Sequence, residues 1–358
     1  MKLTKLMGLG AALFTLAIPV AVTASEAAGE MAGEVAGEVA GEVAGEVNVY
    51  SYRQPNLVQP LFDGFTAKTG IKVNTVFAKK GMAERLAAEG ANSPADVILT
   101  VDIGRLMDVT DRGLVQPVAS DVLSDAIPAN LRDADGQWFG LTTRARVMFV
   151  SKDRVADGAI SDYEQLADPQ WKGRICTRSG AHAYNVALIA SLVAHWGEAK
   201  TMTWLKAVKE NLARKPQGND RAQVKAVAAG ECDIAIGNTY YMGKMINNPD
   251  QKAWADAVRV VFPNSDNRGT HVNVSGMAMA KHAPHKDAAR ALMEYLVSDE
   301  AQALYAEQNY EYPVKAGVAW SDLVKSWGTF KGDELSLSKI ADYRKKAIVL
   351  VHLTGFDN

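Results

Sequence analysis

The sequence predicts an α/β protein of two lobes with a ligand cleft between them. Short apolar runs with strand-like alternation are followed repeatedly by stretches whose apolar residues have helical spacing, which is typical of sheets layered with helices. Two longer extended segments, residues 137–152 and 270–282, interrupt this order and are predicted to cross between the lobes. The length of 358 residues also favours two domains over one.

The first lobe is predicted to hold a parallel sheet with helices on its faces. Three segments have the composition of buried strands: "VNVYSY" (47–52), "IKVNTVFA" (71–78) and "ADVILTVD" (95–102). Apolar residues at helical spacing occupy residues 57–65 and the stretch that begins at Met82. Folded structure is therefore expected to start near Glu46.

The second lobe is predicted to repeat the alternation of strands and helices. Its strands are expected at residues 174–179, 232–237 and 258–263, and its helices at 184–196, 202–213, 220–229 and 239–247. Two more helical stretches, 284–308 and 335–353, are expected to pack back on the first lobe. The predicted first lobe thus comprises residues 46–143 and 270–358, and the predicted second lobe residues 144–269.

The first 24 residues have the pattern of a cleaved secretory signal peptide. Lys2 and Lys5 precede an apolar run that ends in the small residues of "VTA", which suit a signal peptidase. The run is short for a membrane span and no basic cluster follows it, so we expect a periplasmic protein with no stable membrane insertion after cleavage. Residues 25–45 belong to an acidic "AGEV" repeat, which is predicted to be a flexible tail.

Charge and cysteine usage limit the function classes. Residues 1–46 hold two lysines and six glutamates, so 37 basic and 35 acidic residues remain in the rest of the chain. This near balance is not the basic footprint of a nucleic-acid-binding protein. The chain has two cysteines, Cys176 and Cys232, and the sequence leaves open whether they form a disulfide or two buried thiols.

Two adjacent tyrosines follow a predicted strand in "AIGNTYYMGK". With Asn238 as N-cap, the first turn of the next helix would hold Tyr240 and Tyr241, where the helix dipole favours negative charge. Phenolates are hard oxygen anions that suit a hard trication such as Fe(III). The pair alone is also compatible with a packing contact or with a stacking surface for an organic ligand.

Several segments together resemble the periplasmic ferric-ion-binding proteins of bacterial iron-uptake ABC transporters. They occur over residues 46–330 in that family's order and include "SYRQP", "WFGLTTRARV", "WKGRICTRSG", "IGNTYYMGKM" and "NYEYPVKAGV". The resemblance implies the two-lobed type II periplasmic-binding-protein fold. It also implies a monomer that binds Fe(III) and delivers it to an inner-membrane ABC permease.

The resemblance also implies a set of ligands. Tyr240 and Tyr241 match the family's adjacent iron ligands, and Tyr184 in "AHAYNVAL" matches a third tyrosine ligand. Many relatives carry His-Tyr after the first strand, where this chain has Gln54 and Pro55. The remaining coordination sites are therefore expected to be filled by small anions or water. Members of the family with the "SYRQP" pattern use a carbonate-type synergistic anion, so the resemblance implies carbonate or bicarbonate here.

Cationic side chains are expected around such an anion, because a dianion with Fe(III) and three phenolates carries excess negative charge. Arg53 and Arg144 are the first candidates, since a guanidinium matches a carbonate edge. Arg146 lies on the same side of the extended segment as Arg144. Tyr52 and Gln54 are further candidate donors.

Two other function classes compete with iron transport. An organic-solute-binding protein, for a polyamine or a sugar, would share the fold. An enzyme that uses tyrosinate-bound iron for oxidation would ordinarily require histidine ligands and an open substrate position. The sequence contains no cluster of histidines and no nucleophile elbow, P-loop or dinucleotide fingerprint, so we expect a binding protein and not an enzyme. His182, the histidine nearest to Tyr184, is expected to be a polar surface or hinge residue.

Overall fold

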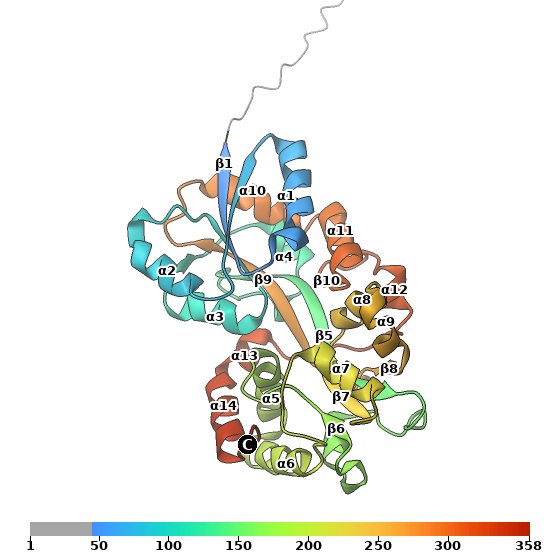
Figure 1. The fold of residues 1–358 in the computed structure, drawn as a ribbon. Helices are drawn as coiled ribbons and strands as arrows, with labels where there is room; N and C mark the ends of the chain where they lie inside the picture. The colour runs from blue at the N-terminus through green and yellow to red at the C-terminus, as the bar shows by residue number, and fades with distance from the viewer. Residues whose placement is uncertain (1–44) are drawn as a thin grey trace, which may run out of the picture. The chain divides into compact units, whose positions relative to one another are not determined.

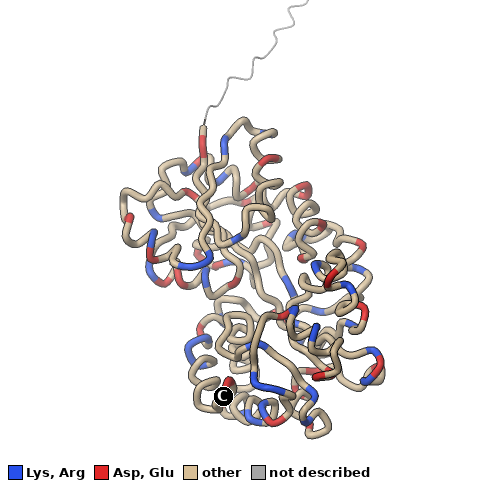
Figure 2. The backbone as a smooth tube through the Cα atoms, in the orientation of Figure 1, with Lys and Arg blue, Asp and Glu red and all other residues tan. Residues whose placement is uncertain are grey.

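A computed structural model describes residues 45–358, and the first strand begins at Glu46 as predicted. The predicted signal peptide and all but the last residue of the predicted tail lie outside the described residues. Within residues 45–358, no helix is both long and apolar enough to span a membrane. Acidic and basic positions are mixed along this part of the chain, as Figure 2 shows.

The first sheet has the predicted parallel core. Strand β1 (Glu46–Ser51) lies between β2 (Lys72–Phe77) and β3 (Val97–Thr100), and all three run parallel. An antiparallel strand, β9 (Val272–Ala280), continues the sheet beyond β3. The connecting helices are α1 (Pro55–Thr69), α2 (Met82–Glu89) and α3 (Ile103–Asp111). Helix α1 buries Val58, Leu61, Phe62 and Phe65, the apolar positions at helical spacing.

One strand links the two halves of the fold. Strand β5 (Phe139–Ser151) is buried along its whole length. Its first half pairs with β9 as far as Ala145, and from Arg146 onward it pairs with β7 (Ile234–Asn238) and β8 (Val258–Val261). Figure 1 shows β5 and β9 running side by side from the upper sheet toward the lower one. The two predicted crossing segments are thus both strands.

The second sheet and its helices carry the other side of the molecule. Strand β6 (Ile175–Cys176) pairs in parallel with β7, and a disulfide joins Cys176 to Cys232 just before β7. The helices are α5 (Ala183–Trp196), α6 (Glu198–Glu210), α7 (Asp220–Ala228), α8 (Tyr240–Ile246) and α9 (Pro249–Asp256). The disulfide resolves the question that the sequence left open about the two cysteines.

Short elements complete the first half of the fold. They are β4 (Val115–Gln116), which pairs with β9, and α4 (Asp121–Ala126). Near the end of the chain, β10 (Tyr312–Pro313) pairs with β5, and it is followed by α12 (Asp322–Lys325).

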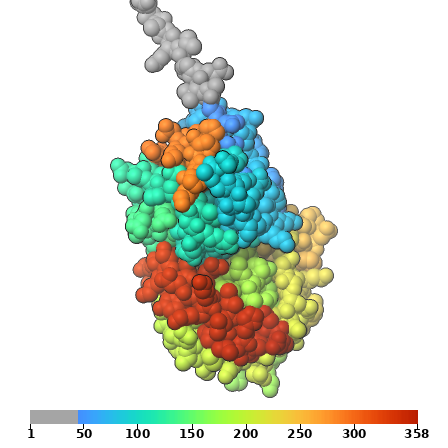
Figure 3. Space-filling model, turned by 90° about the vertical axis from the view of Figure 1, so that its left-hand side faces the viewer, coloured from blue at the N-terminus to red at the C-terminus, as the bar shows by residue number. Residues whose placement is uncertain are grey.

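The helices of the last 80 residues divide between the two halves. Helix α10 (Lys286–Leu296) contacts β1 and α1, and α11 (Asp299–Asn309) contacts α1, as predicted. Helix α13 (Leu337–Asp342) contacts both α3 and α5, whereas α14 (Arg344–Leu353) packs on α5 and α6. The expectation that the last helix returns to the first lobe is therefore wrong for α14. Figure 3 shows this red C-terminal segment against yellow-green residues.

Contacts to the turn before α5 hold α14 in this position. It buries Leu350 and Val351, and a Cβ added at Gly180 would lie 3.1 Å from Val351, so the C-terminal segment fits closely over the turn before α5. Asp357 then accepts hydrogen bonds from the Ser179 hydroxyl and the Gly180 N–H, each at 2.6 Å. The residue limits predicted for the two lobes stay a prediction.

Candidate functional site

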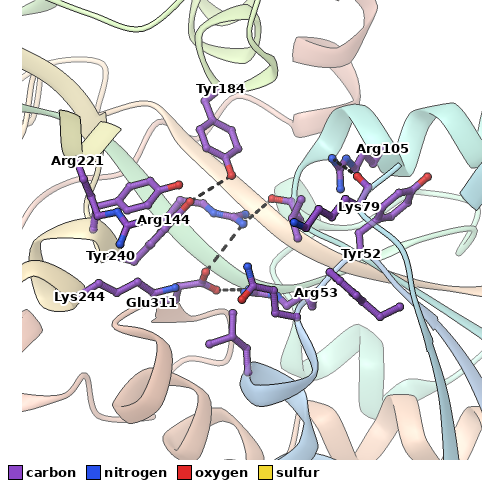
Figure 4. Close-up of a pocket in the computed structure, with 15 residues that line it drawn as sticks. Tyr52, Arg53, Lys79, Arg105, Arg144, Tyr184, Arg221, Tyr240, Lys244 and Glu311 are labelled. Atoms are coloured by element: carbon purple, nitrogen blue, oxygen red, sulfur yellow. Dashed lines mark hydrogen bonds and ion pairs between the residues drawn. The ribbon is translucent and has the colours of Figure 1, made fainter. Parts of the chain in front are cut away.

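A cavity of about 450 Å³ lies between the end of β1, the middle of β5 and the starts of α5 and α8. Seven of the eight predicted site residues line it: Tyr52, Arg53, Gln54, Arg144, Tyr184, Tyr240 and Tyr241. Five charged residues that were not predicted also line it: Lys79, Arg105, Arg221, Lys244 and Glu311. The lining is thus rich in cations and phenols, and Figure 4 shows how these side chains surround the cavity.

The three predicted tyrosines come together from two helix starts. Tyr184 is the second residue of α5, and Tyr240 and Tyr241 are the first two residues of α8. The Tyr240 hydroxyl donates to the Tyr184 hydroxyl at 3.2 Å, and the rings of Tyr240 and Tyr241 lie 4.3 Å apart. Figure 4 shows Tyr184 pointing from its helix toward Tyr240. Phenol oxygens 56 residues apart in the chain therefore meet at one point.

The start of α8 differs from the prediction in one detail. The helix begins at Tyr240, with Thr239 at the N-cap position, so the predicted N-cap Asn238 is wrong. Asn238 is instead the last residue of β7, and its side-chain oxygen accepts a hydrogen bond from Arg146. The Thr239 hydroxyl accepts the Ala145 N–H instead, and the first turn of α8 has no side-chain cap.

Burial makes two of the phenols harder to ionise. It raises the pKa of Tyr240 well above 10, and the neighbouring Tyr184 and Tyr241 raise it further. Burial, followed by the charges of Tyr184 and Asp220, raises the pKa of Tyr241 to about 12. A highly charged metal ion at the phenol oxygens would displace these protons and convert the phenols into phenolates.

The two arginines that are the first candidates for binding the anion use only some of their donor atoms in contacts within the protein. Arg53 forms an ion pair with Glu311 and donates to the hydroxyls of Ser275 and Thr142. Arg144 donates through Nη2 to the Val101 carbonyl and to Ser275. Its Nη1 and Nε are buried and have no partner within residues 45–358. A buried donor without a partner is costly, so Arg144 has capacity for a ligand.

Arg146 is the one predicted residue that does not line the cavity. It is 2% exposed and bonds Asp220, Asn238 and Asn185. Although it lies on the same strand as Arg144, two strand residues shift the side chain by about 6.6 Å. Arg146 therefore lies in the part of β5 that pairs with β7, and its side chain does not reach the cavity.

The other predicted donors sit at the opposite side of the cavity. The Tyr52 hydroxyl accepts from the Met82 N–H at 3.2 Å, and the Arg105 guanidinium lies over its ring. Gln54 is exposed at the N-cap position of α1. Figure 4 shows Tyr52, Lys79 and Arg105 grouped away from Tyr184 and Tyr240.

Two of the unpredicted residues adjust the charge of the site. Lys244 lies 5.2 Å from the ring of Tyr240, and burial, opposed by Glu311 and reinforced by the nearby arginines, lowers its pKa. Burial alone would raise the pKa of Glu311, but Arg53 and Arg144 outweigh it and lower that pKa. Lys244 follows Tyr240 by four residues, a helical spacing that could have revealed it. The position of Glu311 has no comparable local signal.

His182 has a structural place next to the tyrosines. Its Nδ1 accepts the Tyr184 N–H as the N-cap of α5, and its ring packs edge-on against that of Tyr184. Burial and then the charge of Arg178 lower its pKa to about 4, so it is neutral at pH 7. Residues 45–358 contain no cluster of three or more His, Cys, Asp or Glu side chains suited to a metal. Besides Glu311, the cavity therefore offers a metal the phenol oxygens, which become anionic once a metal displaces their protons.

Two sheets linked through β5, each with its own helices, and a cation-lined cavity where they meet are the architecture of a two-lobed solute-binding protein. The chain belongs to the bacterial extracellular solute-binding protein family, whose model matches residues 92–331. The predicted fold class and family resemblance are confirmed.

Ferric-binding proteins are among the similar proteins. Iron uptake protein A1 of Synechocystis is 48% identical over 313 residues, covering 87% of each chain. The structure of Mannheimia haemolytica ferric iron-binding protein A in an open conformation is 52% identical, with a TM-score of 0.85, and the match covers 88% of this chain and all of that one. A Trichodesmium protein in complex with iron and citrate ligands is 46% identical, also with a TM-score of 0.85, over 87% of this chain and all of that one.

Proposed function

We propose that this chain is a periplasmic Fe(III)-binding protein of an ABC uptake system. The observation that carries the proposal is the meeting of Tyr184, Tyr240 and Tyr241 at one end of a cation-lined cavity. Three phenolates supply three negative charges, which balance the charge of Fe(III). The names of the similar proteins, which concern ferric iron and iron uptake, support the same cargo.

A small anion is proposed to complete the iron shell, with carbonate or bicarbonate as the candidate. A dianion beside the neutral Fe(III)–triphenolate unit adds two negative charges. Arg144 offers two unused buried donors, while Arg221 and Lys244 lie near the rings of Tyr241 and Tyr240. Arg53 can contribute from the first strand end, and Tyr52 and Gln54 are proposed as more distant donors across the cavity.

The same site supports transport as the proposed role. The proposed protein is a monomer that loads Fe(III), closes its lobes over it and delivers it to an inner-membrane permease. The first proposed lobe comprises residues 46–143 and 270–358, and the second comprises residues 144–269. Helix α14 is the exception, because its residues are numbered with the first lobe but pack on α5 and α6 of the second. The periplasmic location rests on the predicted signal peptide and on membership of an extracellular family.

A ferric titration tests this function. Ferric nitrilotriacetate is added to the purified protein with bicarbonate, and the visible spectrum is recorded. The proposal predicts a phenolate-to-iron charge-transfer band that saturates at one iron per chain. A colourless protein whose melting temperature rises with a polyamine or a sugar would instead identify an organic-solute-binding protein and overturn the proposal.

A further inference from the structure

Arg146 connects the two chain segments that carry the tyrosines. Its Nη2 donates to the Asn185 side-chain oxygen at 2.7 Å, directly after Tyr184 in α5. Its Nη1 donates to the Asn238 side-chain oxygen at 2.9 Å, two residues before Tyr240. Since one planar guanidinium makes both bonds, it fixes the start of α5 relative to the end of β7.

Asp220 holds this guanidinium in place. It is the first residue of α7 and is fully buried. Its Oδ2 accepts from Arg146 Nη1 at 2.6 Å and from the Asn238 backbone N–H at 2.9 Å. Its Oδ1 accepts from Arg178 Nη1 at 3.0 Å. The carboxylate therefore binds the end of β7 both directly and through Arg146.

Both arginines of this network also contact a proposed iron ligand. The Arg146 and Arg178 guanidinium carbons lie 5.9 and 5.2 Å from the centre of the Tyr184 ring. A buried ion pair contributes little net stability compared with well-packed apolar residues, so stability alone does not account for placing one here. The contacts to Asn185, Asn238 and Tyr184 each hold a chain segment that carries one of the phenols.

We infer that Arg146 and Asp220, here named the Arg146–Asp220 clasp, are positioning residues of the metal site. The clasp sets the separation between the Tyr184 hydroxyl and the hydroxyls of Tyr240 and Tyr241, and through it the affinity for Fe(III). This inference rests on the proposed function. Residues that orient metal ligands typically change metal affinity about 10- to 100-fold when they are replaced.

The same strand offers a matched control at its other end. Asp233 precedes β7 and accepts hydrogen bonds from the Nε atoms of Arg154 and Arg174. Like Asp220, it joins two arginines to the strand, but neither arginine lies over a cavity tyrosine or lines the cavity. Asp233→Asn thus removes an equivalent charge without touching the clasp.

The test compares Asp220→Asn and Arg146→Lys with Asp233→Asn in the full mature protein. Arg146→Lys keeps a cation beside Asp220 but lacks the fork that reaches Asn185 and Asn238 together. Each variant is titrated with ferric nitrilotriacetate and bicarbonate, followed by competition with a chelator. The clasp variants are expected to shift the charge-transfer band and lose about 10- to 100-fold in iron affinity. The control is expected to keep both values even where its melting temperature falls.

If both clasp variants keep the band position and the iron affinity of the wild type, the inference is wrong, although the proposed function still stands. If Asp220→Asn does not fold, the test of the clasp rests on Arg146→Lys, because this variant keeps a cation beside the Asp220 carboxylate. Wild-type protein that gives no band would overturn the proposed function, and the clasp with it. A shift in Asp233→Asn equal to that in the clasp variants would also contradict a specific role for the clasp.

Discussion

Replacing Glu311 by glutamine tests how the cationic cavity is stabilised. Glu311 accepts hydrogen bonds from Arg53 and Thr142, and its other oxygen lies 3.9 Å from Arg144. The side chains of Glu311 and Arg53 are only 3% and 5% exposed, so the variant leaves two buried guanidiniums without a countercharge. Removing one partner of a buried ion pair costs about 3–5 kcal/mol, and we expect Glu311→Gln to lower the free energy of unfolding by that amount.

Urea unfolding followed by tryptophan fluorescence measures this loss in iron-free, bicarbonate-free buffer. Glu300→Gln is the matched control, because Glu300 faces Lys68 at 3.9 Å with both side chains more than 60% exposed. An exposed pair of this kind contributes about 0–1 kcal/mol. Equal losses of unfolding free energy in the two variants would show that Glu311 stabilises the buried guanidiniums no more than an exposed carboxylate does. Since Arg53 loses its carboxylate partner, added iron and bicarbonate should also raise the melting temperature more in Glu311→Gln than in the wild type.

Three further predictions concern pH and the disulfide. Iron affinity should fall as pH drops, because protons compete for Tyr240 and Tyr241, whose pKa values are raised; chelator competition that is unchanged between pH 7.5 and pH 5.5 would contradict this. Burial lowers the pKa of His271 to about 4 from 6.5, so the unfolded state binds its proton first as pH falls. Wild-type protein should therefore lose on the order of 3 kcal/mol more stability than His271→Asn between pH 7 and pH 4, measured by urea unfolding. Replacing Cys176 and Cys232 by serine opens a 56-residue loop and should cost about 4 kcal/mol, whereas an unchanged urea midpoint would show that the bridge contributes nothing.

Features with local sequence signals could be predicted. The strands β1, β2 and β3, the crossing strands β5 and β9, and the helix starts at the three tyrosines follow from apolar periodicity and breaks in it. Helix α3 was not predicted, although Ile103, Leu106 and Val109 have helical spacing and are buried. The predicted tyrosines meet because two strand–helix junctions end at the same edge of the second sheet.

Features that depend on distant partners could not be predicted. Arg146 bonds Asp220, 74 residues away, and Arg53 bonds Glu311, 258 residues away. Periodicity gives the face of a residue on its own element but not which carboxylate will oppose it. For the same reason, Arg146 was predicted as an anion donor although it does not line the cavity. The packing of α14 on α5 was not predicted either.

A tyrosine-to-phenylalanine series tests whether three phenolates bind Fe(III). Wild-type protein, the three single variants of Tyr184, Tyr240 and Tyr241, and their triple variant are titrated with ferric nitrilotriacetate and bicarbonate. Tyr310→Phe is the control, because the Tyr310 hydroxyl accepts from Asn247 beside α8 and does not line the cavity. We expect a visible charge-transfer band that weakens and shifts in each single variant, disappears in the triple variant and is unchanged in the control. A band that persists in the triple variant would show that these phenolates do not bind the iron.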